Sequence, residues 1–442
     1  MTGVMNRTGP RSLLPRFALA IGLAVLACAV GAAAPAAAKP GDAKGKANAK
    51  GKPPKLNEVV FVGNNWEGTA DVIQVIRRGA NHPQFKSVAR LNIIPDREER
   101  MAEILLDPER LGYFLAIRLL VGEGNDQFVD DMYSSNDGRL LIVSRPSFRD
   151  VIGMDIASGE IVWRFVVDGQ RSDHMGLSPD GKHVAVSAST GNVVHILDVE
   201  TGQEVGRFPS GDSPHENTYS EDGERIYHAS IGLVYTPADQ PLLDSTKGAR
   251  YFQVVDTATN QITKRVDIGQ KAAEAGYPDM SSAVRPMAIS SDESRIFMQV
   301  SFHHGFLEYD NVNDRVLRVA NLPDFYGQPR ETYLLDSAHH GIAIDGEDET
   351  LCVAGTMSDY AAMIDVDDFD DYTLLQGLGT KPYWSTTSPD GEYCYVSWSG
   401  TDAISVLHYD SRQEIARIPV GDHPQRVRSG VVTDDWLDAR AG

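Results

Sequence analysis

Histidines recur in this chain in short, similar segments whose side chains could support metal or acid–base chemistry. The segments read SDHMG, SPHEN, YHASIG, SFHHG and SAHHG, and one more histidine precedes Pro424. Neutral imidazole is a good ligand for copper, zinc or iron, and it is also an acid or base near neutral pH. The candidate metal ligands are His174, His215, His228, His303, His304, His339 and His340.

Acidic, basic and aromatic residues accompany these histidines. Carboxylates orient ligating histidines in metal sites or bind a hard cation such as Ca²⁺, and arginines can hold an anionic ligand beside imidazoles. The catalytic candidates are His174, His215, Glu216 and Asp131, with Glu216 or Asp131 as acid or base. The candidate ligand-binding residues are Asp130, Asp173, Arg285, Tyr383, Trp384, Trp398 and Arg426.

No strict catalytic or cofactor motif accompanies this set. The sequence lacks HExxH, a GxSxG elbow, a P-loop, GxGxxG and CxxCH, whose spacings would each indicate a defined chemistry. A functional interpretation therefore depends on a fold that gathers the histidines. The structural alternative is that such side chains fill a channel as hydrogen-bonded plugs.

A repeating unit supplies that fold. One copy begins with the turn Ser178-Pro179-Asp180-Gly181 and continues through three alternating apolar runs. Asp-Gly between such runs is a strong hairpin signal, because both turn positions favour positive φ. Clear copies are about 42 residues apart, the period of a four-stranded propeller blade. Six blades are expected at approximately 128–170, 171–212, 213–270, 281–324, 335–380 and 381–424.

The seventh blade is expected to combine the two ends of the chain. Residues 57–95 supply three strands, and the segment Gln425 to Val432 supplies the inner one. Closure of this kind removes the open sheet edge of a ring. The sequence therefore predicts an all-β, seven-bladed propeller over residues 56–434, followed by a tail at 435–442.

Several repeats are similar to those of a known family. The runs 403–407 and 417–424, the segment 211–214 and the Ser-Pro-Asp-Gly turns resemble the YVTN/YncE-like propeller repeat, within the wider WD40/YVTN-like group. The resemblance covers nearly all of the chain after residue 56 and implies architecture only. That repeat usually has glycine four residues before the serine of its turn. Here Gly341 keeps it, whereas four blades carry larger side chains: Asp131, His174, Glu216 and Trp384.

Strand direction predicts which residues share a face. The connection entering each inner strand and the loop between the second and third strands lie on one face, called the top here, and all the histidines in the segments above map to it. Its connections are long, and function concentrates on long loops over rigid scaffolds. They are 96–127, expected to form two short helices broken at Pro108, and 236–250, 271–280 and 325–338.

The two cysteines of the propeller are expected to stay apart. Cys352 and Cys394 occupy equivalent places on the second strands of neighbouring blades. Equivalent positions on stacked sheets lie about 10 Å apart, and a disulfide needs Cα atoms within about 7 Å. The spacing therefore predicts two separate buried thiols.

The first 38 residues have the pattern of a signal peptide. Basic residues precede an apolar run at 17–30, and Ala36-Ala37-Ala38 is a small-residue cleavage signal. We expect cleavage near Ala38 and a secreted or extracytoplasmic protein without a transmembrane anchor. The alternative is a lipoprotein anchored through Cys28. Residues 39–55 are rich in Lys, Gly, Ala and Pro and are expected to be a flexible linker.

Charge and site together define the functional hypotheses. A formal net charge of −21 argues against nucleic acid as a partner, and a monomer is expected. The first hypothesis is binding of a small molecule, a metal or a peptide at the top face, with copper, zinc, iron or calcium as candidate cofactor. The second is a metal-dependent lyase, hydrolase or copper oxidoreductase using the same histidines. The third is a protein-interaction scaffold without catalysis.

Overall fold

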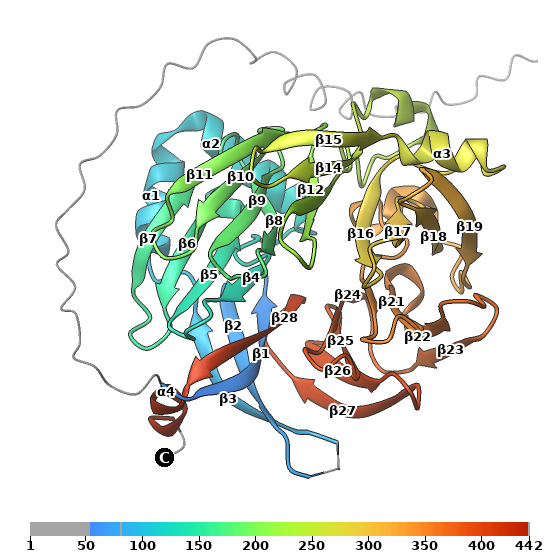
Figure 1. The fold of residues 1–442 in the computed structure, drawn as a ribbon. Helices are drawn as coiled ribbons and strands as arrows, with labels where there is room; N and C mark the ends of the chain where they lie inside the picture. Colours follow the sequence, from blue (N-terminus) through green and yellow to red (C-terminus); the bar gives the residue numbers. More distant parts are fainter. Residues whose placement is uncertain (1–53, 80–81, 441–442) are drawn as a thin grey trace, which may run out of the picture. The chain divides into compact units, whose positions relative to one another are not determined.

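Seven antiparallel sheets of four strands each follow one another around a ring (Figure 1). The structure is a computed structural model, and it describes residues 54–79 and 82–440. The expected signal peptide and nearly all of the expected linker lie outside the described residues. Inner strands of neighbouring sheets contact one another, and the last strand contacts the inner strands on both sides of it. The expected seven-bladed β-propeller is therefore confirmed.

Six of the sheets consist of four consecutive strands side by side, as the repeat predicted. The first three sheets after the N-terminal one comprise β4 (Met132–Ser134), β5 (Leu140–Arg145), β6 (Asp150–Asp155), β7 (Ile161–Val166); β8 (Ser172–Leu177), β9 (His183–Ala188), β10 (Val193–Asp198), β11 (Glu204–Pro209); and β12 (Pro214–Tyr219), β13 (Arg225–Ser230), β14 (Phe252–Asp256), β15 (Gln261–Val266). The next three comprise β16 (Val284–Ile289), β17 (Arg295–Val300), β18 (Gly305–Asp310), β19 (Arg315–Asn321); β20 (Ile342–Ile344), β21 (Thr350–Gly355), β22 (Tyr360–Asp365), β23 (Tyr372–Gln376); and β24 (Pro382–Thr387), β25 (Tyr393–Trp398), β26 (Ala403–His408), β27 (Gln413–Pro419).

The remaining sheet joins the two ends of the propeller. It contains β1 (Leu56–Asn64), β2 (Thr69–Ile76), β3 (Gln84–Asn92) and, as its inner strand, β28 (Pro424–Thr433). β28 pairs antiparallel with β1, with Val60 opposite Ser429. The ring is thus closed by backbone hydrogen bonds between segments far apart in sequence, as the split repeat predicted.

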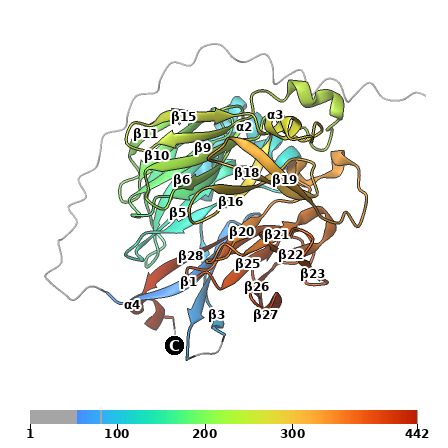
Figure 2. The ribbon, with the colours of Figure 1, turned by 45° about the vertical axis from the view of Figure 1, so that its right-hand side comes forward.

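Within residues 54–79 and 82–440, four α-helices supplement the sheets. The insertion after β3 forms α1 (Arg97–Leu106) and α2 (Pro108–Ala116), and the Asp107 side chain caps α2 by accepting from the backbone N–H groups of its first turn. Pro108 is tolerated there because the first helical position needs no N–H. α3 spans Ile268–Glu274. The expected tail instead begins with α4 (Asp434–Asp438), which lies against β28 (Figure 2).

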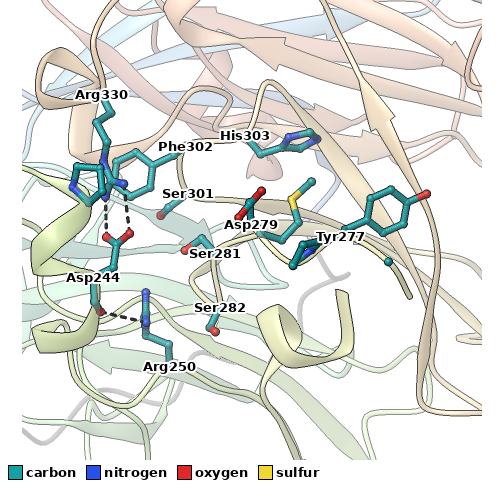
Figure 3. Close-up of a pocket in the computed structure, with 14 residues that line it drawn as sticks. Asp244, Arg250, Tyr277, Asp279, Ser281, Ser282, Ser301, Phe302, His303 and Arg330 are labelled. Atoms are coloured by element: carbon teal, nitrogen blue, oxygen red, sulfur yellow. Dashed lines mark hydrogen bonds and ion pairs between the residues drawn. The ribbon is translucent and has the colours of Figure 1, made fainter. Parts of the chain in front are cut away.

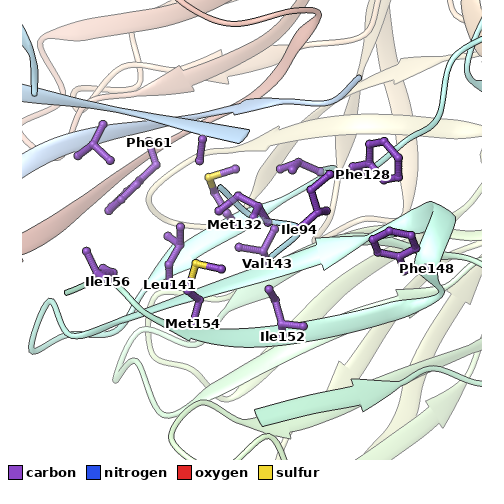
Figure 4. Packing of buried hydrophobic residues seen from close by; sticks show 14 of the residues in the cluster. Phe61, Ile94, Phe128, Met132, Leu141, Val143, Phe148, Ile152, Met154 and Ile156 are labelled. Atoms are coloured by element: carbon purple, nitrogen blue, oxygen red, sulfur yellow. The ribbon is translucent and has the colours of Figure 1, made fainter. Parts of the chain in front are cut away.

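A large apolar cluster joins the N-terminal sheet to the next one. Phe61 of β1 and Met132 of β4 are both fully buried there, and Leu141, Ile152 and Met154 pack around them (Figure 4). The same cluster takes residues from α1, α2 and α4. The helical insertion and the C-terminal helix are therefore anchored to the ring by core packing.

Cys352 and Cys394 form a disulfide, so the prediction of two separate thiols is wrong. Their Cα atoms are 6.5 Å apart, below the spacing of ordinary packed sheets. The two blades approach closely at three glycines: Gly341 directly precedes β20, and Gly346 and Gly391 lie in the turns that follow β20 and β24. A Cβ on Gly341 would collide with the backbone of Trp384 and Ser385, and one on Gly346 would lie 3.0 Å from the Cα atom of Gly391.

Among the described residues, no helix is long and apolar enough to cross a membrane.

Candidate metal and ligand site

A β-bulge interrupts each of the seven inner strands where it begins. In β8, for example, Ser172 pairs with Ala188 and Met175 with Val186, so two residues of the inner strand face one residue of β9. The same two-against-one pattern occurs in the other six sheets. Bulges re-aim side chains and are common beside functional sites. The bulged pairs are Asp130–Asp131, Asp173–His174, His215–Glu216, Arg285–Pro286, His340–Gly341, Tyr383–Trp384 and Gln425–Arg426.

Three of the predicted histidines converge at these bulges. Ligand atoms of His174, His215 and His340 all lie within 4.8 Å of one another. The ring centroids of His174 and His215 are 3.7 Å apart, and His340 stacks on Tyr383 at 4.0 Å. All three histidines are at most 4% exposed. A second group with the same spacing comprises Asp130, Asp173 and His174.

The two nitrogens of His174 have different partners. Nδ1 lies 2.8 Å from Oε2 of Glu216, and Nε2 contacts an amino group of Arg426. Since a guanidinium can only donate, Nε2 accepts, and the ring proton is assigned to Nδ1, which donates to Glu216. The guanidinium of Arg426 also lies over the ring of Trp384, with Cζ 3.9 Å from its centroid.

Burial keeps these imidazoles neutral. Loss of hydration lowers the pKa of His174, His215 and His340 well below 6.5, and the nearby positive charge of Arg426 lowers each of the three further. Neutral imidazole has a lone pair available to a metal. In this structure Nδ1 of His215 and both ring nitrogens of His340 have no hydrogen-bond partner among the described residues.

The carboxylates around the histidines differ in their pairing. Asp131 forms a two-pronged ion pair with Arg428 at 2.9 and 2.8 Å. Asp130 is 3.7 Å from Arg426, its Oδ2 has no partner among the described residues, and burial raises its pKa to about 7. Burial likewise raises the pKa of Glu216 to about 8.

A cavity of about 140 Å³ opens beside the histidines. In six of the seven bulged pairs, the residue that comes first in the chain lines this cavity. The same irregularity, repeated in successive inner strands, therefore builds the site. The six residues are Asp130, Asp173, His215, Arg285, Tyr383 and Gln425. Its rim consists of Val121, Thr190, Ser213, Val234 and Leu335, which are partly or fully exposed, and Gln127, Arg171, His174, Ser189 and Ile231 complete the lining.

Other predicted site residues lie elsewhere. Trp398 packs in a buried cluster beside the disulfide and donates to Ser405, so it does not line the cavity. His228 is buried within its blade between Ser210 and Glu216. A second histidine group, separate from the first, makes its own hydrogen bonds: His303 with the Ala320 carbonyl, His304 with Tyr333 and His339 with Tyr360.

Two arginines of the site were not anticipated. Arg428 pairs with Asp131, and Arg171 pairs with Asp173 and lines the cavity. Both lie two residues from a bulged residue. The only sequence signal was nearness to other candidate residues, since Arg171 lies two residues before Asp173 and Arg428 lies two residues after Arg426.

A larger groove of about 770 Å³ lies where three of the long top connections meet. Figure 3 shows Arg330 reaching down to Asp244, and these two side chains form an ion pair of 2.6 Å. Arg250 donates to the backbone carbonyl of the same Asp244. Arg330 thus has an ion-pair partner within the protein, and Arg250 has a backbone acceptor.

Comparison with known proteins establishes the fold alone. No family model matches the chain, and no curated protein matches it. Among solved structures, the chain resembles hydrazine synthase from Kuenenia stuttgartiensis, with 14% identity and a TM-score of 0.52 over 69% of this chain and 95% of that one. At that identity the likeness carries the propeller architecture and no activity.

Proposed function

We propose that this protein binds a transition-metal ion at the top of its channel through His174, His215 and His340. The observation that supports the proposal is the convergence of three buried imidazoles whose ligand atoms lie within 4.8 Å of one another. These rings come from three different blades, so no local hairpin geometry brings them together.

The unpartnered nitrogens favour a ligand over a structural plug. Buried polar groups are nearly always hydrogen-bonded, and an unsatisfied one costs about 1–3 kcal/mol. Nδ1 of His215 and both ring nitrogens of His340 lack partners among the described residues. Metal coordination would satisfy one nitrogen on each ring.

The donor types select the metal class. Imidazole suits copper, zinc and iron, whereas calcium prefers an all-oxygen site. Glu216 accepts a hydrogen bond from Nδ1 of His174. It is therefore positioned like the carboxylates that orient ligating histidines in metal sites. Asp173 could supply a fourth donor, because it shares the second cluster with His174.

One contact must change when the metal binds. Arg426 occupies the lone pair of His174 Nε2, which is the atom that faces away from Glu216. Coordination through this atom requires the guanidinium to withdraw, so the arginine competes with the metal for the site.

Metal analysis of the exported protein tests the proposal. Protein stripped with EDTA is loaded separately with Cu(II), Zn(II) and Fe(II), dialysed and analysed by elemental mass spectrometry. We expect one ion per chain with at least one of these metals. His340→Ala and His215→Ala should each lose at least ten-fold in affinity.

His408→Ala is the matched control, because His408 lies on β26 and its ring hydrogen-bonds, among the described residues, only to Ser411. Thermal unfolding of each variant shows whether it is folded. Absence of metal from the loaded wild type, or equal binding by all four proteins, would contradict the proposal.

A metal-dependent enzyme is the second candidate, and Asp130 is the observation in its favour. This carboxyl lines the cavity, has one free oxygen, and has a pKa of about 7, which suits a general acid or base near neutral pH. Asp130→Asn should then abolish turnover while leaving metal content unchanged. We also propose, as the sequence predicts, that the protein is located outside the cytoplasm and that its ligand is small.

A further inference from the structure

Arg285 lies in the floor of the cavity and has no ion-pair partner among the described residues. The side chain is 1% exposed. Its Nε donates to Ser301 Oγ at 2.9 Å, and one amino group donates to the backbone carbonyl of Leu335. Both acceptors are uncharged. A buried guanidinium is normally paired with an anion, because removing it from water costs several kcal/mol.

The nearest acidic groups are committed to other cations. Asp336 lies 2.8 Å from the ammonium of Lys247, and Asp173 pairs with Arg171. Asp130, the remaining acid of the lining, is 3.7 Å from Arg426. Each lining carboxylate is therefore associated with another guanidinium, and Arg285 has no ion pair of its own among the described residues.

The loop that holds Arg285 has an unusual backbone. Leu335 and Asp336 are both left-handed, with φ of 51° and 64°. Residues other than glycine rarely adopt this conformation, and such strain concentrates at functional loops. Asp336 is fixed by Lys247 and by the Thr236 hydroxyl. This arrangement presents the carbonyl of Leu335 to Arg285 in place of a carboxylate.

The cavity combines this charge with an apolar wall. Val121, Ile231, Val234, Leu335 and Tyr383 contribute to its lining. Its volume of about 140 Å³ corresponds to roughly four or five water molecules at about 30 Å³ each. An inorganic oxyanion would fill the charged part but leave the apolar wall uncovered, whereas a short-chain carboxylate covers both.

We infer that the cavity binds a short-chain carboxylate, with its carboxylate on Arg285 and its alkyl chain against the apolar rim. A guanidinium matches a carboxylate in a two-pronged hydrogen bond. The inference rests on the proposed function, since it assigns a ligand class to the same site, beside the three histidines.

Calorimetric titration with butyrate tests the inference. It is performed on EDTA-stripped protein and on protein loaded with the metal it retains. We expect one butyrate per chain in both forms. Arg285→Gln should weaken binding at least ten-fold, whereas Arg250→Gln, in the neighbouring groove, should not.

Two further variants guard against a folding defect at the buried arginine. Val234 lies on the partly exposed rim, so Val234→Asp can be tolerated and should weaken butyrate binding by charge repulsion. Val234→Asn is its uncharged control and should retain most of the affinity.

The outcomes are distinguishable. The inference would be overturned if butyrate did not bind, or if Arg285→Gln bound butyrate as tightly as the wild type does. It would also be overturned if butyramide bound as tightly as butyrate, or if sulfate bound more tightly. Metal binding without butyrate binding would overturn this inference and leave the metal proposal intact. Butyrate binding to a protein that takes up no metal would overturn the metal proposal and leave this inference intact.

Discussion

Arg426 on the last strand donates to His174 on the third sheet, and Glu216 accepts from the opposite nitrogen of the same ring. This chain of contacts fixes both the tautomer and the orientation of His174. It also makes the arginine the competitor of any cation that approaches the histidine.

Removal of this competitor should strengthen metal binding. In Arg426→Gln the lone pair of His174 Nε2 is released and a positive charge is lost from the site, so we expect a gain of roughly ten-fold in affinity, or about 1.4 kcal/mol. Competition with a chromophoric chelator measures it. Weaker metal binding by Arg426→Gln would show that the guanidinium supports the metal site.

Glu216 should act on the metal through His174. Loss of a carboxylate that orients a ligating histidine typically costs 10–100-fold in metal affinity, and we expect a loss in this range for Glu216→Ala. Glu216→Gln keeps an acceptor for Nδ1–H and should lose less. If both variants bind as the wild type does, His174 is not a ligand through Nε2.

The disulfide should contribute substantially to stability. It closes a loop with a sequence separation of 42 residues, for which the chain-entropy relation gives about 4 kcal/mol. Reduction of the disulfide should lower the free energy of unfolding of the wild type by this amount, seen as a lower midpoint in denaturant unfolding. The same treatment should leave the midpoint of Cys352→Ala/Cys394→Ala unchanged. Two reactive thiols in unreduced, denatured protein produced without residues 1–38, and so without Cys28, would show that the bond does not form.

Arg145 should be essential to the anchoring of the helical insertion. This fully buried side chain pairs with Asp150 at 2.8 Å and with Asp96, just before α1, at 2.6 Å. Removal of one partner from a buried pair typically costs about 3–5 kcal/mol, and Arg164 still contacts Asp150, so we expect roughly 3 kcal/mol for Arg145→Met. Urea unfolding measures it. The exposed Arg139→Met should change stability by less than about 1 kcal/mol.

Stability should fall in acid because buried histidines must take up protons on unfolding. Burial lowers the pKa of His228 from 6.5 to about 3, so between these values the unfolded chain binds the additional proton. The stabilisation is complete above pH 6.5 and is lost as the pH falls toward 3, at up to about 1.4 kcal/mol per pH unit for this residue.

His228→Gln should reduce this pH slope by that amount. Denaturant unfolding from pH 7 to pH 4 provides the measurement, with His183→Gln, at the partly exposed start of β9, as the matched variant. An unchanged slope in His228→Gln would mean that His228 does not remain neutral in the folded protein.

The ring and its closure could be predicted because their signals are local. The Asp-Gly turns and alternating apolar runs define each hairpin, and strand direction then places the histidines at one end. The sequence could not show that His174, His215 and His340 form one cluster while His303, His304 and His339 form another. That division depends on the bulges, because a bulge changes the direction in which the side chains of an inner strand point.

The cysteine prediction was wrong for a related reason. It used a uniform spacing between sheets, whereas the actual spacing depends on side-chain size at each contact. Gly341 and Gly346 remove that bulk at one junction between blades. This close approach of the two blades can be recognised only when the positions of both are known.

Because β28 supplies Gln425 and Arg426, the cavity has no complete form until β28 has been synthesised and has docked beside β1. A chain cut before Pro424 would carry His174, His215 and His340 and still lack the wall that β28 supplies. Ligand binding would then depend on the docking of β28, and a bound ligand would in turn stabilise this strand beside β1.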